Sequence, residues 1–117
     1  MKLSISQKLI TVSALGVAAL AFSGASSAAV NADAAQALAK KSDCLKCHAI
    51  DKDKKASSYK KIAAKWKGKA DAEAKLTDAL TKAPKVKMAD GTEEEHKVIA
   101  TKDAAEIKNL VGWILAQ

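Results

Sequence analysis

The sequence of 117 residues predicts an all-α fold. Apolar side chains recur at helical spacing in several segments, and no alternating apolar and polar stretch is long enough to predict a strand. The clearest helical stripe lies near the C-terminus, where four residues follow the i, i+3, i+4, i+7 spacing of a buried face. These residues are Ile107, Leu110, Val111 and Ile114.

The first helix is predicted over 33–47, with Asp33 as its N-cap. It carries a narrow face of small residues that would let another helix approach closely. Segment 49–58 is polar, rich in lysine and without periodicity, so we expect a loop. The small-residue face predicted for helix 33–47 comprises Ala35, Leu38, Ala39 and Ser42.

Three further segments complete the predicted order. A second helix is expected over 59–67, capped by a serine of 57–58 and ended by Gly68. A third is expected over 71–82, ahead of Pro84, because a proline disfavours helical geometry in the residue before it. Segment 85–101 is interpreted as a long irregular connection. The last helix should begin at Asp103, with Gly112 as a close-approach point for the small face and Trp113 beside it.

Residues 44–48 read Cys-Leu-Lys-Cys-His. Two thiols separated by two residues can each add to a vinyl group of one porphyrin, and the imidazole that follows can bind the iron. The motif therefore predicts one covalently attached haem c. Cys44 and Cys47 would form the thioethers, and His48 would be the proximal iron ligand.

The chain has two cysteines, and both belong to this motif. A CxxC pair can also form a disulfide or act as a thiol oxidoreductase, but those enzymes use a strand-rich fold that this sequence does not predict. A zinc site would need about two further ligands, and no second Cys/His pair exists. A small domain with few aromatic residues would also gain apolar core volume from a bound porphyrin.

The N-terminus resembles a secretory signal. Lys2 and Lys8 precede an uncharged apolar run over 9–22, which small residues follow over 23–29. The run is shorter than the ~20 residues that span a bilayer. We expect a signal peptide over 1–29, with cleavage between 28 and 32, and a mature domain over 30–117. The mature protein should be periplasmic and have no membrane span.

Lysine supplies all of the positive charge, since the chain has no arginine. Loss of Lys2 and Lys8 would lower the formal charge from +7 to +5. Many of the other lysines fall within 40–69. Either they form a basic rim that steers acidic redox partners, or they are a solvated face. Nucleic acid is an unfavourable partner for an exported, arginine-free chain with few aromatic residues.

Segments 37–51, 59–66 and 110–115 together resemble a small bacterial class I cytochrome c. The resemblance implies a bundle of about four helices around one covalently bound haem, with crossed terminal helices and one exposed haem edge. It also implies a carrier of single electrons between periplasmic or membrane-bound redox proteins. No acid-base pair, nucleophile or substrate pocket is evident, so we do not expect an enzyme.

Two departures from this family's pattern concern the iron. The family usually has Gly-Pro before the aromatic at position 59, and the proline carbonyl accepts the proximal histidine's ring N–H. This chain has Ala56-Ser57 there, so the carbonyl of Ser57 would have to serve in a less rigid loop.

The second departure is the sixth ligand, usually a methionine before the last helix. Met88 has that residue type but lies 25 positions before Trp113, whereas His96 lies 17 before it, close to the family spacing of roughly 16. We favour His96, with Met88 as the alternative. An open or lysine-ligated site would instead indicate a haem protein that binds small ligands, such as a sensor or a peroxidase-like catalyst.

Overall fold

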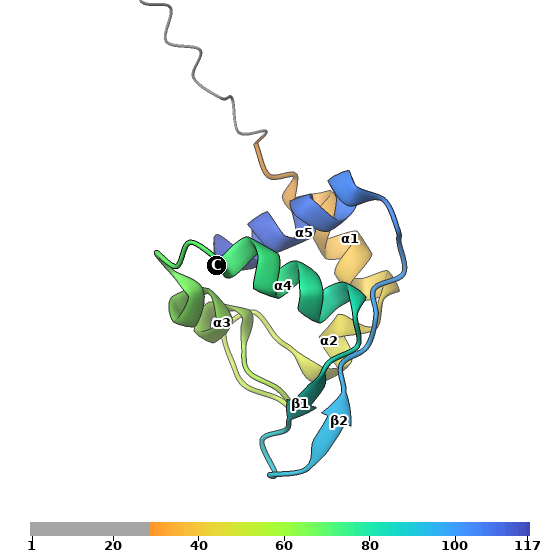
Figure 1. Cartoon of the computed structure of the whole chain (residues 1–117). Coiled ribbons are helices and arrows are strands. Elements are labelled where there is room, and N and C mark those ends of the chain that lie inside the picture. The colour runs from red at the N-terminus through yellow and green to blue at the C-terminus, as the bar shows by residue number, and fades with distance from the viewer. Residues whose placement is uncertain (1–28) are drawn as a thin grey trace, which may run out of the picture.

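The computed structural model describes residues 29–117 as five helices and one small hairpin (Figure 1). Helices α1, α3 and α4 each pack against α5. The predicted signal peptide lies outside the described residues, apart from Ala29. The elements are α1 (Ala32–Lys41), α2 (Cys44–Cys47), α3 (Tyr59–Trp66), α4 (Ala72–Thr81), β1 (Lys85–Lys87), β2 (Glu93–Glu95) and α5 (Ala104–Leu115).

The core lies where the helices meet α5. The small face predicted for the first helix and the stripe predicted for the last are both buried. Tyr59 and Trp113 meet edge to face beside them, with ring centroids 5.2 Å apart. Most of these side chains are aliphatic or small. The core is therefore filled by close packing of the helices, with few aromatic rings.

The join between α1 and α5 uses a residue that the sequence analysis missed. Asn31, not Asp33, caps α1, since its Oδ1 accepts the N–H of Ala34 at 3.0 Å. Asn31 also exchanges two hydrogen bonds with the side chain of Asn109 on α5, at 2.8 and 2.9 Å. We expected Gly112 to approach the small face of the first helix. It instead faces Val30, just upstream of α1.

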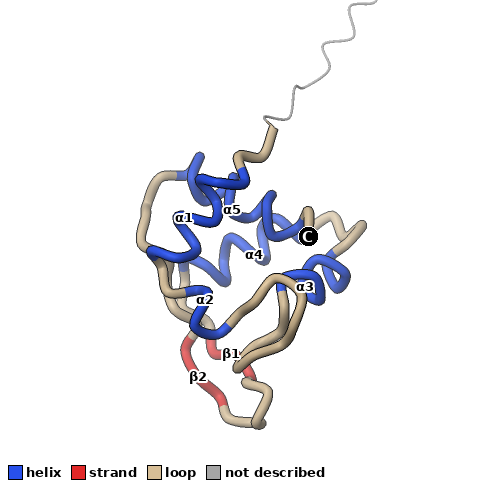
Figure 2. The backbone as a smooth tube through the Cα atoms, turned by 180° about the vertical axis from the view of Figure 1, so that it is seen from behind, coloured by secondary structure: helices blue, strands red, loops and turns tan. Residues whose placement is uncertain are grey.

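The predicted helix over 33–47 is in fact two helices. Asp43 has φ 59°, in the left-handed region, and so interrupts the helical path between α1 and α2. Aspartate tolerates this conformation better than most non-glycine residues. The break turns the attachment motif into a separate short helix that approaches the hairpin instead of continuing along α1 (Figure 2).

The predicted irregular connection over 85–101 contains a hairpin. β1 and β2 pair antiparallel, with Lys85 opposite Glu95 and Lys87 opposite Glu93. Ala89, Asp90 and Gly91 form the turn, where Gly91 adopts φ +87°. Oppositely charged cross-strand pairs and an Asp-Gly turn both favour a hairpin. It lies at the end of the molecule away from the crossing of α1 and α5 (Figures 1 and 2).

The other predicted helix boundaries agree closely with the structure. Ser58 caps α3 and Asp103 caps α5 through their side chains. Gly68 follows α3 with φ +74°. Within residues 29–117, no helix is long and apolar enough to cross a membrane.

Candidate functional site

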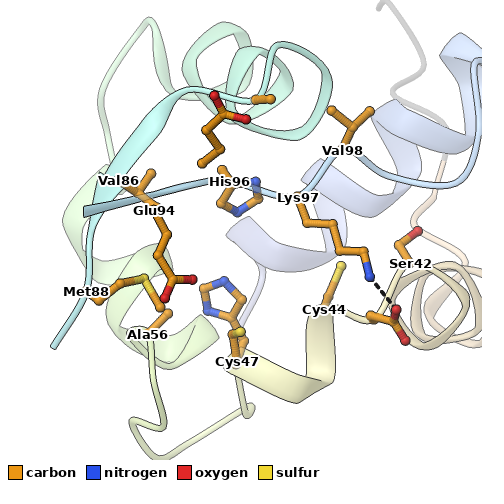
Figure 3. A pocket seen from close by; sticks show the side chains of 14 residues that line it. Ser42, Cys44, Cys47, Ala56, Val86, Met88, Glu94, His96, Lys97 and Val98 are labelled. Carbon is orange, nitrogen blue, oxygen red and sulfur yellow. Dashed lines mark hydrogen bonds and ion pairs between the residues drawn. The ribbon is translucent and has the colours of Figure 1, made fainter. Parts of the chain in front are cut away.

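A cavity of about 520 Å³ lies between α2, the hairpin and the segment that follows β2 (Figure 3). In Figure 3, Cys44 and Cys47 rise from α2 on one side, and His96 lies on the segment that crosses opposite. Every residue that the sequence analysis selected lines this cavity. They are Cys44, Cys47, His48, Met88 and His96.

Helix α2 places both thiols on the cavity wall. Cys44 and Cys47 are its first and last residues, and neither forms a disulfide. Burial raises the pKa of the Cys44 thiol above its ordinary value. Thiol oxidoreductases need the opposite shift, because the thiolate is the nucleophile. The environment of Cys44 therefore does not favour a dithiol redox site.

His48 is held by one hydrogen bond that sets its tautomer. Its Nδ1 lies 2.6 Å from the carbonyl oxygen of Ser57, the contact expected in place of the family's proline. A carbonyl can only accept, so Nδ1 carries the proton and the lone pair of Nε2 is available for a metal. Burial lowers the pKa of His48, and this outweighs the opposing effect of the bond to Ser57. The neutral imidazole that metal binding requires is favoured.

His96 lies across the cavity from His48. The centroids of the two rings are 6.3 Å apart, with the ring planes inclined by 43°. A metal between two imidazoles lies about 2 Å from each ligating nitrogen, which places the ring centres about 6 Å apart. Nδ1 of His96 is buried and has no hydrogen-bond partner among the described residues. The separation of the rings therefore fits an iron held between them.

Met88 also lines the cavity, but from the turn of the hairpin. Its backbone N–H donates to the carbonyl of Thr92 at 2.8 Å, so it lies at the start of that turn. Residues of the hairpin and of the segment that follows it line the same cavity. They are Val86, Met88, Glu94, Glu95, His96, Lys97 and Val98.

The family model for cytochrome c matches residues 32–117. The protein belongs to the cytochrome c family. The CxxCH motif and this membership together identify its cofactor as one covalently attached haem c, and the cavity beside the motif fits that group.

Solved structures support the same assignment for this cytochrome c. A class 1 cytochrome, MtoD from Sideroxydans lithotrophicus ES-1, is 55% identical over 75% of this chain and 97% of its own, with a TM-score of 0.72. Cytochrome c552 of Nitrosomonas europaea is 27% identical over 68% of this chain and 95% of its own, with a TM-score of 0.54. No curated protein gives a significant match. The class I cytochrome c fold expected from the sequence is confirmed.

Contacts that the sequence analysis missed attach the His96 segment of the cytochrome to the rest of the chain. The Lys97 ammonium pairs with the carboxylate of Asp43, at the left-handed turn before α2. The N–H of Ala100 donates to the buried hydroxyl of Ser42 at 2.9 Å, and the N–H of Ile99 to the carbonyl of Leu80 at 3.0 Å. These residues are far apart in sequence, so no local pattern indicated the contacts.

The charged residues that line the cavity of this cytochrome c are not mainly basic. They are three acids and one lysine, namely Asp43, Glu94, Glu95 and Lys97. None of the lysines of 40–69 lines the cavity. The attachment helix and the loop that follows it carry the exposed lysines Lys46, Lys52 and Lys54 and the exposed apolar side chains of Leu45 and Ile50.

Proposed function

We propose that this cytochrome c is a periplasmic monohaem carrier that shuttles single electrons between redox proteins, either soluble or membrane-bound. The observation that carries the proposal is the placement of two imidazoles, those of His48 and His96, across one cavity at a separation that fits a shared iron. Haem c supplies an iron that changes its oxidation state by one electron.

In this proposal the chain's own residues attach and enclose the cofactor. The thiols of Cys44 and Cys47 form the two thioether bonds. His48 presents Nε2 to the iron while Ser57 holds its Nδ1, and His96 occupies the opposite side. Met88 remains the alternative to His96. A protein ligand on each side of the haem would keep small molecules from the iron. We propose no catalytic residue.

Absorption spectra of the purified protein test the assignment. We expect the pyridine haemochrome of a covalently bound haem c and no band near ~695 nm in the oxidised form, since that band marks iron-methionine coordination. A band near ~695 nm would show that Met88, and not His96, is the sixth iron ligand. Rapid binding of carbon monoxide to the reduced protein would instead favour a small-ligand-binding protein and contradict the carrier.

We also propose that residues 1–29 direct export and that residues 30–117 are the mature domain. The basic start, short apolar run and small-residue segment support this proposal. The intact mass of the protein recovered from a bacterial periplasm should correspond to cleavage between 28 and 32. Recovery of the full-length chain in the membrane fraction would contradict it.

The exposed lysines near α2 support docking to acidic partners. We predict that Lys52→Glu slows electron transfer to an acidic redox protein several-fold at low salt, because one attractive charge becomes repulsive. Lys108→Glu on α5 is the matched control and should have a smaller effect. Stopped-flow rates at increasing salt measure both, and the difference should shrink near 0.15 M, where the Debye length is about 8 Å. Equal effects of the two variants would contradict a docking surface near α2.

A further inference from the structure

One peptide group beside His48 is held from both sides. The carbonyl of Ser57 accepts the hydrogen bond from Nδ1 of His48 at 2.6 Å. The N–H of Ser58, which belongs to the same peptide group, donates to Oδ1 of Asp53 at 2.8 Å. A continuous chain of hydrogen bonds therefore joins the carboxylate of Asp53 to the imidazole of His48.

The carboxylate of Asp53 is itself fixed at its other oxygen. Oδ2 lies 2.7 Å from Nζ of Lys61, on the first turn of α3. The hydrogen bonds from Lys61 and from the Ser58 N–H lower the pKa of Asp53, so its side chain is ionised at neutral pH. The side chain is 45% exposed, which screens its direct charge effect on distant groups.

We propose that Asp53 is a positioning residue that orients His48 and strengthens its Nδ1–H hydrogen bond through the Ser57–Ser58 peptide group. The proposal rests on the assignment of His48 as an iron ligand.

The physical basis is polarisation of an amide. A carboxylate that accepts from the N–H of a peptide group draws its proton, and the carbonyl oxygen of that group becomes a stronger acceptor. A stronger acceptor at Nδ1 raises the basicity of the imidazole, and a more basic ligand stabilises the oxidised iron. Asp53 should therefore lower the reduction potential of the haem.

The same contact explains how the loop remains ordered without the family's proline. Ser58 is buried, its hydroxyl caps α3, and its N–H is held by Asp53. These hydrogen bonds restrain the peptide group through contacts with other residues, whereas a proline would restrict the backbone through its ring. Asp53 thus restrains by hydrogen bonding a loop that has no proline at this position.

The experiment compares the holoprotein with Asp53→Asn, which removes the charge but keeps an oxygen that can accept from Ser58. We expect the reduction potential to shift upward and the Nδ1–H proton resonance of His48 in the reduced protein to move upfield. Asp51→Asn is the matched control, since it removes the same charge two positions away. It should shift the potential less and leave the proton resonance in place.

Lys61→Gln provides an independent variant with the opposite sign. It frees the Asp53 carboxylate from its ion pair and should lower the potential. Asp53→Glu keeps the carboxylate, so its reduction potential should lie closer to that of the wild type than the potential of Asp53→Asn does.

Equal shifts in Asp53→Asn and Asp51→Asn would overturn the proposal, because a direct charge effect would then suffice. An unchanged potential in Asp53→Asn, with haem content and absorption spectrum intact, would also overturn it while leaving the ligand assignment in place. A His48→Ala variant that keeps the wild-type absorption spectrum and reduction potential would show that His48 is not an iron ligand and would overturn both.

Discussion

Replacing His96 by alanine is expected to open one side of the iron and to make the reduced protein bind carbon monoxide rapidly, which the wild type should not do. The variant removes the imidazole whose ring centre lies 6.3 Å from that of His48. The reduction potential should change by on the order of 0.1 V, a fraction of the ~0.8 V range over which axial ligands act. Flash photolysis and protein-film voltammetry measure the two effects.

Met88→Ala is the matched control for this prediction, since Met88 lines the same cavity from the turn of the hairpin that precedes His96. It should leave carbon monoxide binding slow and the low-spin spectrum unchanged. The reverse result, an open site in Met88→Ala and a closed one in His96→Ala, would show that methionine is the ligand.

Replacing Leu110 by alanine is expected to lower the free energy of unfolding by about 3 kcal/mol. Leu110 is 0% exposed at the centre of the core, and truncation of a buried leucine typically costs 2 to 5 kcal/mol through lost burial and a residual cavity. Against a total of about 5 to 15 kcal/mol, this is a large loss. The melting temperature should fall by about 12 to 24 °C. Urea and thermal unfolding of the holoprotein measure it.

Ile50→Ala tests whether this loss comes from burial. Ile50 is a branched aliphatic residue of the same size, but it is 40% exposed. Its truncation should cost under about 1 kcal/mol. A comparable loss in both variants would mean that Leu110 does not contribute as a core residue.

The helices were predictable because their signals are local. The stripe of α5, the serine cap of α3 and the aspartate cap of α5 each follow from residues within a few positions of one another. The hairpin was missed because its strands are short and charged, although the Asp90-Gly91 pair is a turn signal.

The attachment motif was predictable for the same reason, since its chemistry depends on five consecutive residues. Membership of the cytochrome c family supports the haem c that this motif indicated. The hydrogen bond from His48 to Ser57 was also expected from the sequence and is present. The Asp53 carboxylate behind that bond was not expected, because an aspartate in a lysine-rich loop has no distinctive pattern.

By itself, the sequence determined the helical class, the haem motif and the two candidates for the sixth ligand, His96 and Met88. Only the tertiary structure decided that His96 lies opposite His48 and that Asp43 and Ser42 anchor the segment that carries it. The reason is physical. Helix periodicity and thiol spacing are set by neighbouring residues, whereas the position of His96 depends on a hairpin register and on contacts made across more than fifty residues.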